Sequence, residues 1–262
     1  MAGGYPLARE RNLIVASLII LAALAWLFLA RQAGTGMDHD AVPGLTMGMS
    51  APLFLAVWVV MMVAMMFPTA APMILTFARV HASKREKGQA FVPTWVFVAA
   101  YLLVWTAFGA LAFVLALGAQ ALAAGSASVM ENAGRIGGVA VLLAGLYQLS
   151  PLKHVCLSKC RSPLGFIMTS WRDGYGGAFR MGLEHGVYCL GCCWLLFVLL
   201  FPLGMMNIAA MALITLLIFA EKSLAIGLWA SRAAAVALVA YGLLVLVMPM
   251  LLPTSVPPTE GM

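Results

Sequence analysis

The sequence predicts an all-α protein, a polytopic transmembrane helical bundle of about seven spans. Hydrophobic residues make up 64% of the 262 positions and charged residues only 9%, whereas soluble domains are about 45–50% apolar and about 25% charged. The apolar residues are gathered in runs of about 20, the length that crosses the core of a bilayer as a helix. A chain this apolar cannot cover itself with polar surface in water, so we take the lipid bilayer as its solvent.

Seven apolar segments are candidates for membrane spans. In order along the chain they are Asn12–Ala30, Ala51–Ala78, Pro93–Leu117, Met130–Leu149, Leu183–Phe201, Asn207–Trp229 and Arg232–Leu252. The first is longer than the apolar part of a cleavable signal peptide, about 7–15 residues, so we interpret it as a retained helix. The fourth is the weakest, and its Gly137, Gly138 and Gly145 are typical of close packing against another helix. The last two are separated by a turn at Ser231-Arg232, and the number of spans falls to six if one segment is re-entrant.

Basic residues in the loops predict the orientation. With the N-terminus in the cytoplasm, twelve of the 15 Lys and Arg residues lie on the cytoplasmic side, Arg31 and Arg135 lie on the far side, and Lys222 lies within a span. This bias favours a cytoplasmic N-terminus. It also explains the net charge of +6, so we expect no nucleic-acid partner. We treat residues 1–262 as a single domain, with a cysteine-containing cytoplasmic loop at residues 150–182.

The stretch from His185 to Trp194, on the predicted fifth span, is rich in residues that bind metals. At about 100° per residue, His185, Cys189, Cys192 and Cys193 share an arc of about 100° on one helix face. Soft thiolate ligands suit Cu(I), Zn(II) or Hg(II). A single cysteine in a membrane helix is usually a packing residue, but three on one face beside a histidine predict a metal site.

Two more cysteines, Cys156 and Cys160, form a CxxxC pair in the predicted loop before this span. The neighbouring cations Lys159 and Arg161 favour the thiolate, which is the form that binds metal. We therefore expect these two sulfurs to join the cluster from the same side of the membrane. Such clustering is typical of metal or redox chemistry rather than of a disulfide framework.

Glu221 and Lys222 lie inside the sixth predicted span, where a charge costs at least about 2.5 kcal/mol unless it is paired or hydrated. A rise of about 1.5 Å per residue puts Glu221 at a depth similar to that of Cys189. Glu221 is therefore a candidate metal ligand, proton acceptor or counter-charge beside the thiols. The alternative is a structural ion pair with Lys222 or Arg232, although adjacent residues of a helix face different ways.

Four methionines, Met61, Met62, Met65 and Met66, form a broad stripe on the second span. Their thioethers could pass Cu(I) along, and methionine is equally common as a gap-filler in apolar packing. Both readings stay open. Pro68 interrupts the helix hydrogen bonds just after the stripe, and we expect Thr69 to satisfy a freed carbonyl.

These pieces together resemble a family of uncharacterised bacterial proteins described as predicted metal-binding integral membrane proteins. The resemblance covers roughly residues 50–230. It rests on Trp58 with the methionine stripe and Pro68, on residues 160–164 and 171–174, on the stretch from His185 to Trp194, and on Asn207, Glu221 and Lys222. It implies a multi-pass protein of the bacterial inner membrane that binds a metal ion, and it names neither the metal nor an activity.

We expect this protein to handle copper as Cu(I), with zinc as the second choice, by transport, by delivery or by insertion into a partner membrane protein. One alternative is a transmembrane thiol–disulfide oxidoreductase. The vicinal pair Cys192 and Cys193 would form a strained disulfide, and Cys189 with Cys193 or Cys156 with Cys160 would pair more comfortably. The other alternative is a structural accessory subunit of a larger membrane complex. No catalytic triad, P-loop or dinucleotide motif is present, which argues against an enzyme.

Overall fold

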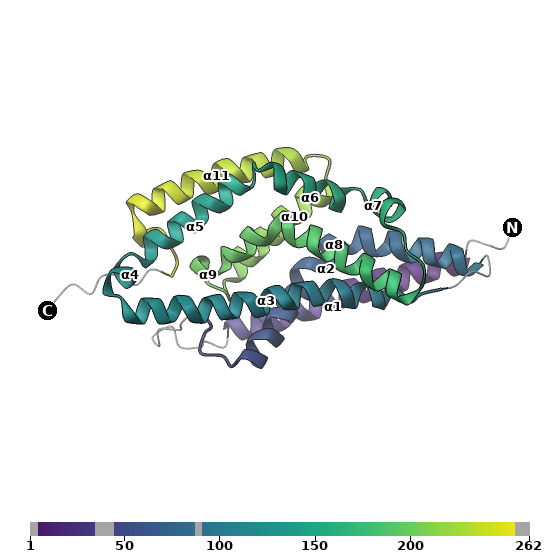
Figure 1. Cartoon of the computed structure of the whole chain (residues 1–262), viewed down its shortest axis with the longest axis horizontal. Coiled ribbons are helices and arrows are strands. Elements are labelled where there is room, and N and C mark those ends of the chain that lie inside the picture. Colours follow the sequence, from purple (N-terminus) through teal and green to yellow (C-terminus); the bar gives the residue numbers. More distant parts are fainter. Residues whose placement is uncertain (1–4, 35–44, 87–90, 255–262) are drawn as a thin grey trace.

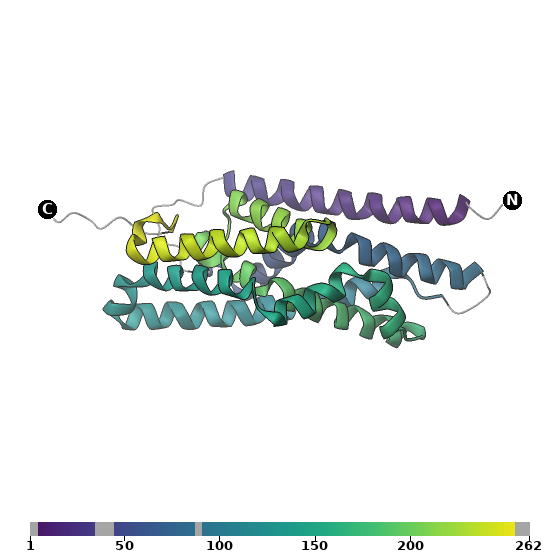
Figure 2. The ribbon, with the colours of Figure 1, turned by 90° about the horizontal axis from the view of Figure 1, so that it is seen from above.

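The computed structural model describes residues 5–34, 45–86 and 91–254, and these ranges contain helices and no strand (Figure 1). The long helices run along one axis and form an elongated bundle (Figures 1 and 2). They are α1 (Tyr5–Gly34), α2 (Ala51–Glu86), α3 (Thr94–Gly125), α5 (Ala133–Tyr147), α8 (Gly174–Val198), α10 (Ile208–Ser223) and α11 (Gly227–Val247). The shorter elements are α4 (Ala127–Glu131), α6 (Pro151–Arg161), α7 (Pro163–Ser170), α9 (Leu200–Leu203) and the 3₁₀ helix η1 (Pro249–Leu251).

The transmembrane helical bundle predicted from the sequence is confirmed, since each of the seven predicted segments contains a helix. Within the described ranges, α1, α2, α3, α8 and α11 are each long and apolar enough to cross a membrane. Helices α5 and α6 qualify together as a sixth span, bent by 62° between them. Helix α10 has 16 residues, fewer than the roughly 20 that a full span requires. Length and composition thus give five or six spans.

Helix α2 is the interior helix of the bundle. In its most apolar stretch 61% of the residues are buried, compared with 22% for α1, α3 and α11. The indole of Trp58 donates to the carbonyl of Trp105 at 3.0 Å and lies over Gly109, where a Cβ would come within 2.4 Å of the ring. Because Gly109 has no side chain, α3 can lie directly against α2.

Helix α2 stays continuous through Pro68 because another group replaces the missing hydrogen bond. Pro68 has no N–H to donate to the carbonyl of Ala64, one turn earlier. The indole N–H of Trp26 in α1 donates to this carbonyl instead, at 3.0 Å. The Thr69 hydroxyl donates to the carbonyl of Met66, also at 3.0 Å. Since Pro68 and Pro72 free the carbonyls of residues 64 and 68, the prediction that Thr69 satisfies a freed carbonyl is wrong.

Glycines also bring α5 and α11 together, as the sequence predicts for the fourth span. A Cβ on Gly138 would lie 2.9 Å from Val245, and one on Gly145 would lie 2.8 Å from the backbone of Val239. The two helices run side by side in both views (Figures 1 and 2). Small residues on facing helices let the backbones approach and increase van der Waals contact.

The prediction of a turn at Ser231-Arg232 is wrong, because the turn lies between Ser223 and Gly227. Arg161 of α6 explains the earlier break. Its guanidinium donates to two carbonyls at the end of α10, at 2.7 and 3.1 Å, and so satisfies groups that a longer helix would bond internally. Gly227 supplies the room, since a Cβ there would lie 2.0 Å from the guanidinium.

Residues 150–182 form α6, α7 and the first turns of α8 instead of the loop that we expected. The Ser150 hydroxyl accepts a hydrogen bond from the backbone N–H of Lys153 at 3.1 Å, which caps the start of α6. Pro151 follows at the first helical position, where its missing N–H costs nothing. The CxxxC pair therefore lies on a helix, and that helix packs against α8.

We predict that Trp26→Phe lowers the free energy of unfolding by about 1 kcal/mol, the size of a hydrogen bond inside a membrane protein. The cause is the carbonyl of Ala64, which loses its donor. Unfolding of the purified protein by increasing SDS in mixed micelles measures the loss. Trp95→Phe is the matched control, because Trp95 is 67% exposed.

The double variant Trp26→Phe/Pro68→Ala separates this cause from lost packing. Alanine at position 68 restores an N–H for the carbonyl of Ala64, so the double variant should lose less than the two single losses added together. Strictly additive losses would contradict the proposed hydrogen-bond replacement.

Candidate metal centre

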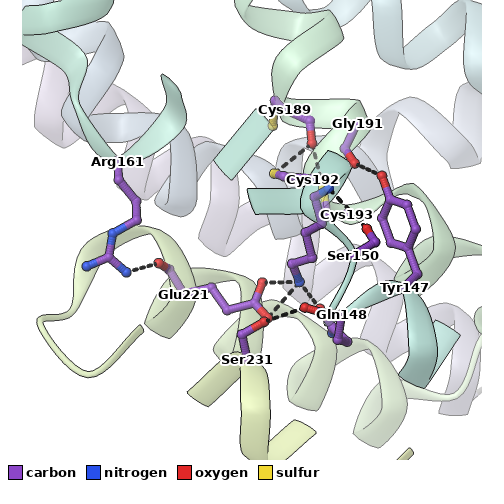
Figure 3. Close-up of polar contacts among 11 residues, drawn as sticks. Tyr147, Gln148, Ser150, Arg161, Cys189, Gly191, Cys192, Cys193, Glu221 and Ser231 are labelled. Carbon is purple, nitrogen blue, oxygen red and sulfur yellow. Dashed lines mark hydrogen bonds and ion pairs between the residues drawn. The ribbon is translucent and has the colours of Figure 1, made fainter. Parts of the chain in front are cut away.

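Helix α8 places four of the predicted ligands in the core of the bundle. His185, Cys189, Cys192 and Cys193 each expose 2% or less of their surface. Figure 3 shows the three cysteines grouped together on this helix. The helix face that the spacing predicts is therefore the buried face.

Two glycines determine how closely α8 approaches α3. A Cβ on Gly182 would lie 2.4 Å from the carbonyl oxygen of Phe97, and one on Gly186 would lie 2.9 Å from Val104. Since these glycines are one helical turn apart, α8 can lie directly against α3 along that face. The contact brings in Tyr101 of α3, whose hydroxyl lies 3.2 Å from Cys189 Sγ.

Two further helices complete the group. Cys160 of α6 is buried, and its thiol lies close to those of Cys189 and Cys192. Within α8, the thiols of Cys189 and Cys192 each interact with that of Cys193. Lys222 of α10 donates from Nζ to Cys189 Sγ at 3.0 Å. The thiol cluster, defined as Cys160, Cys189, Cys192 and Cys193, is thus built by two helices and faces a cation from a third.

The thiol cluster is hydrogen-bonded internally rather than open. Cys192 and Cys193 donate from Sγ to the carbonyl oxygen of Cys189, at 3.0 and 2.8 Å (Figure 3). All five cysteines are free thiols. Over the described ranges, no group of three or more His, Cys, Asp or Glu side chains is arranged to hold a metal ion. An ion that binds these two sulfurs displaces their thiol protons, so both hydrogen bonds to the carbonyl are lost.

His185 precedes Cys189 by one helical turn and is 2% exposed. Its ring lies against Tyr101, with centroids 5.5 Å apart, and against Phe97 at 5.8 Å. Neither ring nitrogen has a hydrogen-bond partner. Because a buried polar atom without a partner is costly, this imidazole is an uncommitted nitrogen donor beside the thiols.

Cys156 lies one turn before Cys160 on α6 and is only partly buried. Its sulfur packs against Gly191, where a Cβ would come within 2.7 Å of Sγ. It borders the cluster without a hydrogen bond to it in the described part of the chain. Of the two cysteines in the CxxxC pair, the structure therefore brings Cys160 into the cluster and leaves Cys156 at its edge.

The methionine stripe of α2 is buried in the apolar core. Met61, Met62, Met65 and Met66 are each exposed by 1% or less. Met66 Sδ lies 3.8 Å from the Thr69 hydroxyl. The four side chains belong to the same hydrophobic cluster as the cysteines. Their surroundings are those of core packing, the second of the two readings left open by the sequence.

The carboxylate of Glu221 is bound by Lys153 of α6, with Nζ 2.7 and 2.8 Å from its two oxygens. Both side chains are fully buried, with exposures of 1% and 0%. Lys153 also donates to the side-chain oxygen of Gln148. The expected ion pair exists, but its partner is Lys153 rather than Lys222 or Arg232.

Sequence reasoning missed the role of Lys153 and the partner of Lys222. Lys153 was counted among the loop cations, although a buried Glu221 required a counter-charge somewhere in the chain. Lys222 was recognised as an intramembrane charge, and its partner turned out to be a cysteine. In both cases the sequence signal was a charge inside an apolar segment, which by itself does not identify the partner.

The fold and the cluster together define a polytopic helical membrane protein with four cysteines in contact in its core. This chain belongs to the copper chaperone family PpoB2, which matches residues 55–245, most of the chain. The membership confirms the resemblance to metal-binding membrane proteins and supports a role connected with copper. No curated protein and no solved structure shows significant similarity to the chain.

We predict that Glu221 stabilises the folded protein through its ion pair with Lys153. Glu221→Leu should lower the free energy of unfolding by about 3–5 kcal/mol, because it leaves the Lys153 charge buried without a partner. The double variant Glu221→Leu/Lys153→Met should recover most of this loss. SDS unfolding measures both, and copper content measured on the stable double variant supplies the second readout. A stable double variant that had lost its copper would instead identify Glu221 as a ligand.

Proposed function

We propose that this protein is a membrane copper chaperone that holds Cu(I) at the thiol cluster and hands it to a partner membrane protein. The observation that carries this proposal is the mutual contact of four buried thiols in a chain of the copper chaperone family. Soft thiolate ligands select Cu(I) over the hard cations that carboxylates prefer. The family membership supports copper as the metal, and the thiol cluster would provide its ligands.

The proposed ligands come from two helices, so binding would link α6 to α8. Cys160 contributes one sulfur, and Cys189, Cys192 and Cys193 offer three more. His185, with both nitrogens unpartnered, is a further donor one turn away. Cu(I) needs fewer ligands than this group contains, which allows the ion to change partners without leaving the cluster.

Delivery fits this arrangement better than rapid transport. Fast conduction requires sites that bind weakly enough to release the ion at each step. A buried group of thiols would hold a soft ion strongly, and the buried Met61, Met62, Met65 and Met66 are packed in the core. We therefore favour transfer by ligand exchange, with the partly buried Cys156 at the edge of the cluster as the sulfur that a partner reaches first.

For location, we propose the bacterial inner membrane with the N-terminus in the cytoplasm. The charge bias of the sequence supports this orientation. The start of α1 and the end of α2 lie together, since Arg85 pairs with Glu10. Lys84, next to Arg85, pairs with Asp173 at the start of α8. These basic residues therefore gather at one end of the bundle, which would be the cytoplasmic end.

A thiol–disulfide oxidoreductase is the second candidate, because Cys189 and Cys192 have the CxxC spacing of redox-active pairs. Their thiols are in contact. Four of the five cysteines are buried. A buried pair is poorly placed to exchange a disulfide with a partner protein, and this disfavours the oxidoreductase. The experiment below separates the two functions.

We predict that the purified protein, loaded with Cu(I) under anaerobic reducing conditions in detergent, retains about one copper ion per chain. Changing Cys160, Cys189, Cys192 and Cys193 together to Ser should lower the bound copper more than about tenfold. Cys156→Ser is the matched control and should keep its copper. Elemental analysis after gel filtration measures the copper-to-protein ratio.

Stoichiometric copper in the four-serine variant would disprove the thiol cluster as the site. A wild-type protein that binds no copper, and whose cysteines form and lose a disulfide reversibly, would support the oxidoreductase instead.

A further inference from the structure

Lys222 is a cation in the core of the bundle whose partner is a sulfur atom. Its side chain is 9% exposed, and Nζ donates to Cys189 Sγ at 3.0 Å. The ammonium lies near the four sulfurs of the thiol cluster and also near Tyr101 and His185. A lysine buried beside thiols is unusual, because a charge in an apolar interior needs a counter-charge or strong hydrogen bonds.

The carboxylate of the preceding residue, Glu221, does not supply that counter-charge. Glu221 precedes Lys222 directly, and adjacent residues point about 100° apart on a helix. Its two oxygens are both bound by Lys153 of α6, which makes this a separate, neutral ion pair. The positive charge of Lys222 is therefore left for the thiol cluster to balance.

We propose that Lys222 is a specificity-determining residue whose ammonium balances the charge of a cuprous thiolate complex and disfavours divalent metals. This inference rests on the proposed function. Two thiolates around Cu(I) carry one net negative charge, and the ammonium beside Cys189 cancels it. A neutral assembly is far cheaper to bury than a charged one.

The same charge acts against Zn(II). For a given set of thiolates, the ammonium repels a divalent ion twice as strongly as a monovalent ion at the same distance. The repulsion is effective here because the core screens charges less than water does. Four thiols alone would be a good zinc site. Beside the ammonium, Zn(II) forms a neutral assembly only with three thiolates, so it must displace one more proton from the buried thiols than Cu(I) does.

The test compares the affinities of Cu(I) and Zn(II) in detergent, each measured by competition with a chromophoric chelator. The readout is the ratio of the Kd for zinc to the Kd for copper. Lys222→Met should lower this ratio by about 100-fold, by weakening copper and strengthening zinc, since the repulsion and the charge balance are both removed. Lys222→Arg, which keeps the charge, should stay within about tenfold of the wild-type ratio.

Arg31→Met is the matched control. It removes a positive charge from an exposed side chain at the end of α1, away from the cysteines, and it should leave the ratio unchanged. Lys222→Gln, which is also neutral and keeps a hydrogen-bond donor, serves if Lys222→Met does not fold, and its expected ratio is the same.

The ratio of the two Kd values distinguishes a role of Lys222 in metal selectivity from a role in supporting the fold. A Lys222→Met or Lys222→Gln protein in which both affinities fall together, with the ratio unchanged, would show that the lysine only supports the fold and would overturn the inference alone. A wild-type protein that binds no copper would overturn the proposed function and the inference with it.

Discussion

A charge or a freed carbonyl inside this bundle has to find its partner within the protein, because lipid offers neither a hydrogen bond nor a counter-charge. The contacts that result join helices far apart in the sequence. The carbonyl freed by Pro68 bonds to Trp26 of α1, and the carboxylate of Glu221 bonds to Lys153 of α6. Apolar side chains tolerate several arrangements of neighbouring helices, so these polar contacts are what select one. Among the described residues, His185 and His81 each keep two unpartnered ring nitrogens, and those of His185 lie beside the thiols. Such departures are typical of functional sites.

The end of α10 shows how the rule builds the candidate site. Two successive residues, Glu221 and Lys222, point in different directions, and each holds a different helix. Glu221 binds Lys153 of α6, while Lys222 donates to Cys189 of α8. Arg161 of α6 then closes the end of α10 through backbone carbonyls. Helices α6 and α8, which contribute all the sulfurs of the thiol cluster, are therefore both tied to one short helix, and the spacing of their cysteines depends on it.

The sequence predicted those features that depend on one helix at a time. The arc from His185 to Cys193 follows from helical periodicity alone, and its face is the buried one. The close packing at the glycines of α5 follows from local rules for membrane helices. The pairs Lys153–Glu221 and Lys222–Cys189 could not be predicted in this way, because each depends on the packing of segments remote in the chain. The predicted position of the turn before α11 is wrong for the same reason, since an arginine of α6 determines where α10 ends.

In the proposed function, a chaperone must bind copper firmly and also surrender it, and the closed state of the cluster bears on both. The thiols of Cys192 and Cys193 already have an acceptor in the carbonyl of Cys189. Copper binding releases the thiol protons and so removes these hydrogen bonds, and copper release with uptake of the protons restores them. The net affinity is therefore the strength of the copper–sulfur bonds minus that of the contacts they replace. A metal-free state that satisfies its own thiols lowers the cost of release, and this makes a buried thiol site compatible with delivery rather than storage.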